Sequence, residues 1–416
     1  MPQTIHSHTF DNGLVLLAEP LAWLESAAFT LLIPGGCSLE PADRGGLAAM
    51  SCEMALRGCG PRDSRAFVDA LDSLGLERGE SASSAHASFS GATLARNLMP
   101  ALSIYADLVR RPHLAAEQLE PARATALQEL ESVEDEPSHK VMMELRRRHY
   151  PDPWGRPSTG DRAGIEATTI DDIRSFVSQC YQPRRSILAV AGRVEWEPLL
   201  DLVGSLFGDW KPTSAAETQI GTAGPRQSHI AHESNQTQIG VAYSSVAYRD
   251  PQYFQAWGAV GALSGGMSCR LFTEVRERRG LCYSVYATHH TLRDRGSVLC
   301  YAGTSAERAQ ETLDVLVAEL VRLAQGIEPF ELDRLKARVK SGLIMQQESS
   351  SARSGAIARD WHLLGRVRPL DELGALVDAL SCDSINSYLA AHPPRDFTIV
   401  TLGPNPLEVP VAVSAA

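Results

Sequence analysis

The pattern of apolar and polar residues repeats along the chain of 416 residues. Segments with helical spacing and segments with strand spacing occur in the same order in each half. Thr168–Gly192 has helical spacing, a proline turn, and then a short β-branched strand that ends in glycine. Ser381–Gly403 has the same pattern, and the two terminal glycines are 211 residues apart. A repeat that spans half of the chain predicts two related domains rather than a solenoid of small units.

The segments before these repeats also correspond. A strand pattern over Ala85–Thr93 precedes a helical pattern over Leu94–Pro112. In the second half, strands are predicted at Cys282–His290 and Gly296–Ala302, and two helices over Ser305–Met345, broken near Gly326. Strands that are followed by helices and a closing strand predict an α+β fold. We therefore expect two homologous bilobed domains, each a mainly antiparallel sheet with helices packed on one face.

The domain boundary is predicted from composition. Residues 211–228 are rich in Gly, Pro, Ser and Thr, which is typical of a linker. The predicted domains are therefore residues 1–210 and 229–416.

Composition and charge narrow the classes of function. A hydrophobic content of 44% and a charged content of 21% are typical of a globular protein. The net charge of −11 argues against nucleic acid and against a basic membrane-binding face. No secretory leader and no apolar run of about 20 residues is visible. The eight cysteines form no C-x-x-C pair, so we expect reduced, mostly buried thiols and a cytoplasmic protein.

The stretch "GGLAAMSCEMALRGCG", from Gly45 to Gly60, is a helical segment between glycines. With the two-domain repeat, it resembles the insulinase-like zinc metallopeptidases, which include pitrilysin and the mitochondrial processing peptidase. In that family this helix carries the inverted zinc motif H-x-x-E-H. The matching residues are Gly46-Leu47-Ala48, Met54 and Arg57-Gly58, and further matches are "RDSRAFVDALDSLG" (Arg62–Gly75) and "YPDPWGRPSTG" (Tyr150–Gly160).

The residues that should perform the chemistry are missing from this helix. Two histidines four residues apart can ligate one zinc ion from one helical face, and the glutamate activates the bound water. Matched to the family motif, these positions hold Ala49, Cys52 and Glu53, and the distant carboxylate ligand matches Glu129. Alanine has no ligand atom, and adjacent residues point about 100° apart on a helix. The resemblance therefore implies a degenerate zinc site without a metal, in which Cys52 is a small buried residue and Glu53 and Glu129 are solvated or hydrogen-bonded.

The second half retains a different part of the family pattern. "GGMSCRLFTEVRERRGLCYSVYA", Gly265–Ala287, resembles the C-terminal substrate-handling segment of active members. The resemblance assigns Arg276 and Tyr283 as the arginine and tyrosine that hold the bound peptide. Both are hydrogen-bond donors that can bind a peptide carbonyl and its developing oxyanion. The alternatives are a surface ion pair for the arginine and a core position for the tyrosine.

Loss of the zinc residues with retention of the arginine and tyrosine is the pattern of one subunit in heterodimeric family members. We therefore expect a non-catalytic, substrate-binding subunit of a zinc metalloendopeptidase that acts on peptides enclosed in a chamber. The resemblance implies no cofactor in this chain, and a homologous partner that carries H-x-x-E-H and the zinc ion. One alternative is a peptide-binding or scaffolding protein with no hydrolytic complex. The other is a peptidase that is active alone and binds metal at Cys52, Glu53 and Glu129.

Overall fold

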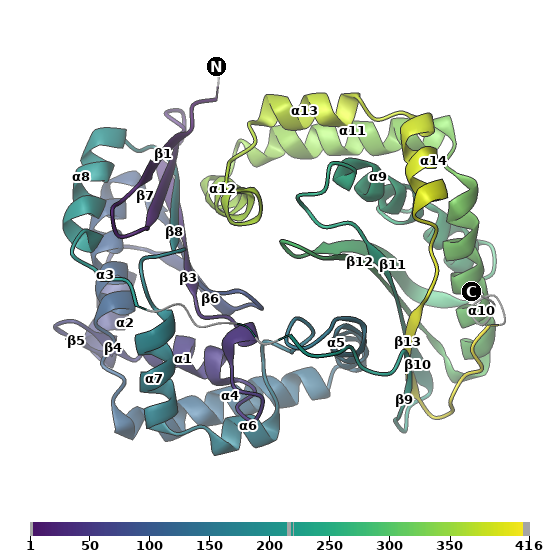
Figure 1. The fold of residues 1–416 in the computed structure, drawn as a ribbon, viewed down its shortest axis with the longest axis horizontal. Helices are drawn as coiled ribbons and strands as arrows, with labels where there is room; N and C mark the ends of the chain where they lie inside the picture. The colour runs from purple at the N-terminus through teal and green to yellow at the C-terminus, as the bar shows by residue number, and fades with distance from the viewer. Residues whose placement is uncertain (1–2, 214–217, 219, 411–416) are drawn as a thin grey trace. The chain divides into compact units, whose positions relative to one another are not determined.

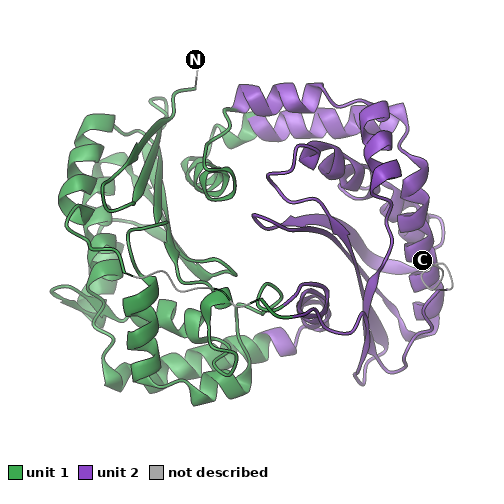
Figure 2. Ribbon diagram, viewed as in Figure 1, with its two compact units in different colours: residues 1–132, 152–221, 344–369 green, residues 133–151, 222–343, 370–416 purple. Residues whose placement is uncertain are grey.

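The computed structural model describes residues 3–213, 218 and 220–410. The chain forms two compact units, shown in different colours in Figure 2. Unit 1 is formed by residues 1–132, 152–221 and 344–369, and unit 2 by residues 133–151, 222–343 and 370–416. The units differ from the predicted halves, 1–210 and 229–416, by two exchanged segments. Part of the predicted linker 211–228, namely residues 214–217 and 219, lies outside the described residues.

Unit 1 contains a six-stranded sheet with the order β1-β2-β8-β3-β7-β6. Only the β2–β8 pair is parallel among the described strands of this sheet. The turn at Asn12-Gly13, a dipeptide that is typical of hairpins, joins β1 to β2, and Gly13 has a φ of +87°. The strands are β1 (His6–Thr9), β2 (Val15–Pro20), β3 (Ser26–Pro34), β6 (Glu77–Ala82), β7 (His86–Leu94) and β8 (Ile187–Gly192).

Helices cover one face of this sheet (Figure 1). Side chains of β2, β3 and β7 that point to this face form one apolar core with α1, α3, α7 and α8. A capping box of Thr169 and Asp172 starts α7. The helices are α1 (Leu47–Ala55), α2 (Ser64–Ser73), α3 (Leu98–Arg110), α4 (Leu119–Glu134), α6 (Arg162–Ala167), α7 (Ile170–Cys180) and α8 (Trp196–Phe207); two short strands, β4 (Gly58–Cys59) and β5 (Arg62–Asp63), pair after α1.

Unit 2 repeats this architecture with a five-stranded sheet of order β11-β12-β10-β13-β9. Apart from β1, the orders match strand by strand, so that β11 corresponds to β6 and the parallel β13–β9 pair to the parallel β8–β2 pair. The elements are β9 (Gln227–Ala231), β10 (Gln236–Ser245), α9 (Tyr253–Leu263), β11 (Cys282–Thr291), β12 (Gly296–Ser305), α10 (Ala309–Arg322), α11 (Pro329–Gln346), α13 (Leu370–Asp378), α14 (Cys382–Ala391) and β13 (Thr398–Gly403). The predicted α+β fold with two related, mainly antiparallel sheets is confirmed.

Each unit also receives one helix from the other half of the sequence. Helix α12 (Ser350–Leu364) packs on β2, β3 and β8 of unit 1, and α5 (Pro137–His149) packs on β10 and β13 of unit 2. Both helices lie on the sheet face that the other helices leave open, and this exchange is not apparent from the sequence. Helical periodicity identifies an apolar face but does not say which sheet covers it.

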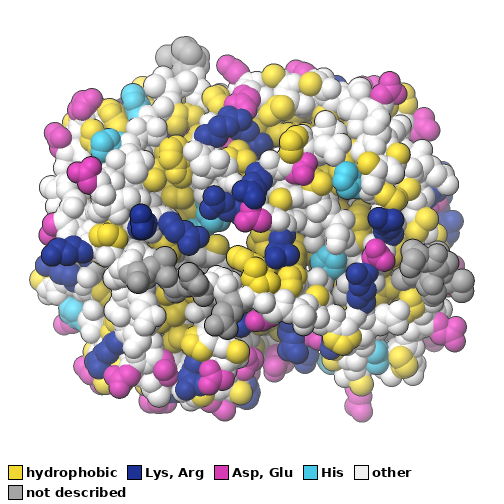
Figure 3. All heavy atoms as spheres, viewed as in Figure 1, with side chains coloured by type: hydrophobic (Ala, Val, Ile, Leu, Met, Phe, Trp, Pro, Cys, Tyr) yellow, Lys and Arg dark blue, Asp and Glu magenta, His cyan; other side chains and the backbone are white. Residues whose placement is uncertain are grey.

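Acidic and basic side chains are interspersed on the face of each unit that Figure 3 shows. None of the described helices is both long and apolar enough to cross a membrane. All eight cysteines are free, and six of them are buried.

Candidate functional site

Helix α1 of unit 1 is fixed at its start by contact between two backbone segments. Gly46 has a φ of +99° and Gly160 a φ of +75°, a region that favours glycine. A Cβ atom on residue 160 would lie 2.3 Å from the Cα of Gly46. The glycines before α1 and in the Tyr150–Gly160 loop therefore serve close packing, and this requirement is independent of metal binding.

A buried carboxylate completes the start of α1. Glu40 accepts hydrogen bonds from the backbone N–H groups of Gly46 (3.3 Å) and Ala48 (2.7 Å). The side chain is buried, and this burial outweighs the two donors and raises its pKa to about 7. Sequence reasoning missed Glu40 because it precedes the helix by seven residues and is not at the N-cap position.

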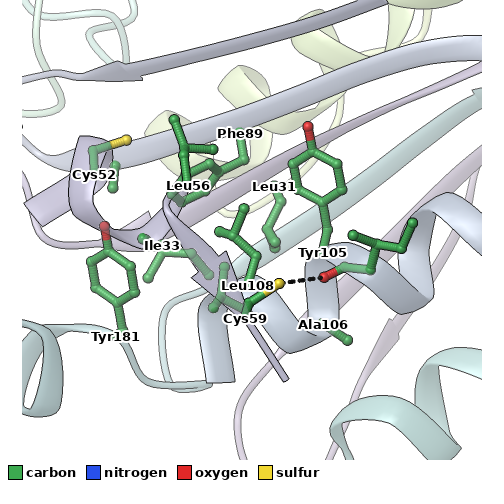
Figure 4. Close-up of a cluster of buried hydrophobic side chains, with 14 of the residues drawn as sticks. Leu31, Ile33, Cys52, Leu56, Cys59, Phe89, Tyr105, Ala106, Leu108 and Tyr181 are labelled. Carbon is green, nitrogen blue, oxygen red and sulfur yellow. Dashed lines mark hydrogen bonds between the residues drawn. The ribbon is translucent and has the colours of Figure 1, made fainter. Parts of the chain in front are cut away.

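The positions of the family motif on α1 lie in different environments. Ala49 is partly exposed, whereas Cys52 is only 4% exposed and belongs to the apolar core of unit 1. Figure 4 shows the thiol among this core, which also includes Leu56, Phe89 and Tyr181. Burial raises the pKa of the Cys52 thiol, so the thiol stays protonated at neutral pH and is not an activated nucleophile.

Glu53 is held by an arginine. Its Oε1 lies 2.6 Å from Nη2 of Arg57, one helical turn later. The same guanidinium donates to Gln118 (3.2 Å) and to Thr125 of α4 (3.4 Å). Glu129 lies one turn after Thr125 on α4, is exposed, and has no ion pair with another described residue. Arg57 therefore links the α1 carboxylate to α4.

These residues do not fit a zinc ion. Zinc sites in enzymes use three protein ligands from His, Cys or carboxylate side chains. Here one position offers a methyl group, one a buried neutral thiol, and one a carboxylate that is already paired. Across residues 3–213, 218 and 220–410, no group of three or more His, Cys, Asp or Glu side chains could hold a metal ion.

Arg276 of unit 2 is placed between two aromatic rings. It belongs to the π-helical segment η4 (Phe272–Glu277), and its guanidinium carbon lies 4.8 Å from the ring centroid of Phe272 and 5.0 Å from that of Tyr283. The neighbouring Arg278 and Arg279 bind Glu274 instead. No ion pair of Arg276 occurs with any described residue, so stacking orients its N–H donors without neutralising the charge.

Tyr283 stands out from the edge of its sheet because of a β-bulge. Cys282 pairs with Thr304 and Ser284 pairs with Gly303, so Tyr283 is the extra residue at the start of β11. Its side chain is 85% exposed. Bulges turn side chains away from the regular alternation and are frequent beside active sites. Neither the ion pair nor the core position that we considered as alternatives describes these two residues.

Comparison with known proteins identifies the family. The model of the insulinase family, peptidase family M16, matches residues 22–161, and that of the peptidase M16 inactive domain matches residues 167–339. An uncharacterized zinc protease of Rickettsia felis is 23% identical over 98% of this chain and 99% of its own length. One of Mycobacterium bovis is 27% identical over 95% of this chain and 92% of its own.

Solved structures share the fold. The crystal structure of a peptidase M16 inactive domain from Pseudomonas fluorescens has a TM-score of 0.87 at 23% identity, covering 98% of this chain and 100% of that one. A protease from Helicobacter pylori has a TM-score of 0.87 at 21% identity, covering 97% and 100%. Since the two family models together match most of the sequence, the chain belongs to the insulinase (M16) peptidase family.

Proposed function

We propose that this chain is the non-catalytic, substrate-binding subunit of a heterodimeric zinc metalloendopeptidase in the cytoplasm. A homologous partner would supply H-x-x-E-H and the zinc ion. The observation that carries the proposal is the contrast between two sites of one chain. Helix α1 has lost its ligand atoms, whereas Arg276 and Tyr283 keep available donors beside the edge of a sheet.

Hydrolysis by this chain alone lacks a chemical basis at α1. A zinc-bound water needs ligands that hold the ion and a base that takes the proton. Ala49 cannot ligate, the Cys52 thiol is neutral and buried, and the charge of Glu53 is compensated by Arg57. Peptide cleavage would therefore use the partner's site.

The contribution of this chain would be to hold and orient the peptide. The guanidinium of Arg276 and the phenol of Tyr283 can donate to a peptide carbonyl and to the oxyanion that forms when water attacks. Strand β11 lies at the edge of its sheet and has no charged residue. An edge strand can pair with an extended peptide through the backbone groups of its outer side, which supports an unfolded substrate.

The test is reconstitution with the partner, which is to be co-purified from the native cell. The chain alone should show no chelator-sensitive peptide cleavage, and mixing should produce it. Arg276→Ala or Tyr283→Phe should lower turnover of the mixed complex by more than about tenfold, which corresponds to about 1.4 kcal/mol of transition-state stabilisation. Arg278→Ala is the matched control, because this arginine lies in the same segment but pairs with Glu274.

The outcomes separate the alternatives. Unchanged turnover in both variants would remove the role of Arg276 and Tyr283. Peptide binding without cleavage in any complex would favour the scaffolding protein. Stoichiometric zinc in the purified chain, with chelator-sensitive cleavage, would show instead that the chain is a peptidase by itself.

A further inference from the structure

A polar cavity adjoins Tyr283 in unit 2. Its volume is about 470 Å³, and it lies at the start of β11, against the neighbouring ends of β10 and β12. The side chains that matter for recognition are Gln236, Tyr283, Ser284, Tyr301, Ser305 and Arg308. No Asp or Glu side chain lines the cavity within the described part of the chain. In a protein with a net charge of −11, this is a local region without acidic groups.

A chain of hydrogen bonds orients the amides of the cavity. The hydroxyl of Tyr301 donates to Oε1 of Gln238 (2.6 Å), and Nε2 of Gln238 donates to Oε1 of Gln236 (3.3 Å). Gln238 is 5% exposed, so the network is anchored in the sheet. One lone pair of the Gln236 oxygen is used within the network, whereas Nε2 of Gln236 makes no hydrogen bond to another described residue and can donate to a ligand.

Glycine at position 303 leaves room for this network. A Cβ atom there would lie 2.7 Å from the hydroxyl of Tyr301 and 3.0 Å from Oε1 of Gln238. Burial also raises the pKa of Tyr301 to about 12, so its hydroxyl remains a donor at neutral pH.

Positive charge lies beside these donors. Arg308 lines the cavity and is fixed by hydrogen bonds to the carbonyl oxygens of Gly280 and Arg279, each 2.8 Å long. Its only carboxylate neighbour in the described chain is Glu311, at 3.7 Å. Arg276 stacks on the other ring that borders the cavity, Tyr283. The cavity is therefore lined by side-chain donors and one arginine, with no carboxylate among its lining residues, and such a space favours a ligand that supplies acceptors.

We propose that this cavity is a subsite for a carboxylate of the bound peptide, from an Asp or Glu side chain or from the C-terminus. The inference rests on the proposed function, because the peptide that enters the cavity is the one held at Tyr283. It adds a substrate class to that function: peptides with an acidic group near the residue that contacts Tyr283.

The experiment measures the affinity of dye-labelled ten-residue peptides for the purified full-length chain by fluorescence anisotropy. The peptides have blocked ends and differ at one central position, which holds Glu, Gln or Lys. A fourth peptide, with Gln and a free C-terminus, tests the other source of the carboxylate. The Glu peptide or the free C-terminus should bind about tenfold more tightly than the blocked Gln peptide, and this preference should weaken with added salt.

Two variants with the same added charge locate the site. Gln236→Glu should abolish the preference for the carboxylate and make the Lys peptide the tighter ligand. Gln325→Glu places the same charge on an exposed position of unit 2 outside the cavity and should change nothing. Equal loss of the preference in both variants would overturn the proposal, because the effect would then be one of net charge.

The remaining outcomes separate this inference from the proposed function. Equal affinities for all four peptides, together with weaker binding by Tyr283→Ala, would overturn the carboxylate subsite and leave the substrate-binding role intact. Absence of binding by every peptide would overturn both.

Discussion

The edge strands of the two sheets, β6 and β11, occupy corresponding places, and each contacts a segment from the family pattern. Strand β6 contacts α1, and β11 contacts η4. At β6 the helix keeps its glycines and lacks ligand atoms, and the strand carries Glu77, Arg78 and Glu80. At β11 the strand is uncharged and the donors of Arg276 and Tyr283 are available. The backbone of a site can therefore persist without the catalytic residues, because close packing alone requires the glycines.

The helices that the two halves exchange also differ. Helix α12 is held on unit 1 by a fully buried ion pair, in which Arg353 and Glu19 are each 2% exposed and 2.8 Å apart. Helix α5 is held on unit 2 by apolar contacts of Val141 and Leu145, and by His149, which bonds to Thr398 and Ser297 at 2.9 Å each. Unit 1 thus depends more strongly on charge.

The largest effect is expected from restoring the ligands on α1. Ala49→His with Glu53→His places two imidazoles one turn apart, so zinc affinity should rise by at least about 1000-fold, with Glu129 as third ligand. Adding Cys52→Glu supplies the base but buries a carboxylate in the core, so this triple variant should be less stable than the double. Competition with a chromophoric chelator measures the affinity. No gain in the double variant would mean that α1 and α4 are not placed for zinc.

Breaking the buried ion pair should have the next largest effect. Arg353→Met leaves the carboxylate of Glu19 buried without its partner, and it should lower the free energy of unfolding of unit 1 by about 3–5 kcal/mol. Adding Glu19→Leu should recover most of the loss, because the uncompensated charge is then removed. Hydrogen exchange should show the loss in β2, β3 and β8, with β10 and β13 protected. Equal loss in both units would mean that they unfold together.

The smallest effect concerns the start of α1. Glu40 has a pKa of about 7 in the folded protein and 4.5 as its ordinary value. Between these two pH values the folded state keeps a proton that the unfolded state has lost. The stabilisation of the folded state by this group is therefore present below pH 4.5 and is lost as the pH rises through 7. The loss between pH 5 and pH 8 should be about 2.5 kcal/mol. Glu40→Gln should remove this part of the pH dependence in urea unfolding. If the dependence of the unfolding free energy on pH is the same in this variant, groups other than Glu40 cause it.

Several features of the fold followed from local pattern. The capping box at Thr169, the turn at Asn12-Gly13 and the helix break at Gly326, which has a φ of +99°, are properties of a few neighbouring residues. The exchange of α5 and α12 was not predicted, because it depends on which distant sheet accepts an apolar face. The contacts of Arg57, Glu40 and Gln238 were also missed. Each acts through a contact that no short motif encodes.

The sequence by itself determined the family, the repeat of two α+β domains, and the absence of the two imidazoles and the glutamate from α1. These depend on residue identity and periodic spacing. Only the tertiary structure decided that Arg57 joins Glu53 to α4, that Arg276 stacks on Tyr283, and that a polar cavity without carboxylates lies beside that ring. The physical reason is that pairing, burial and exposure depend on neighbours brought together by the fold.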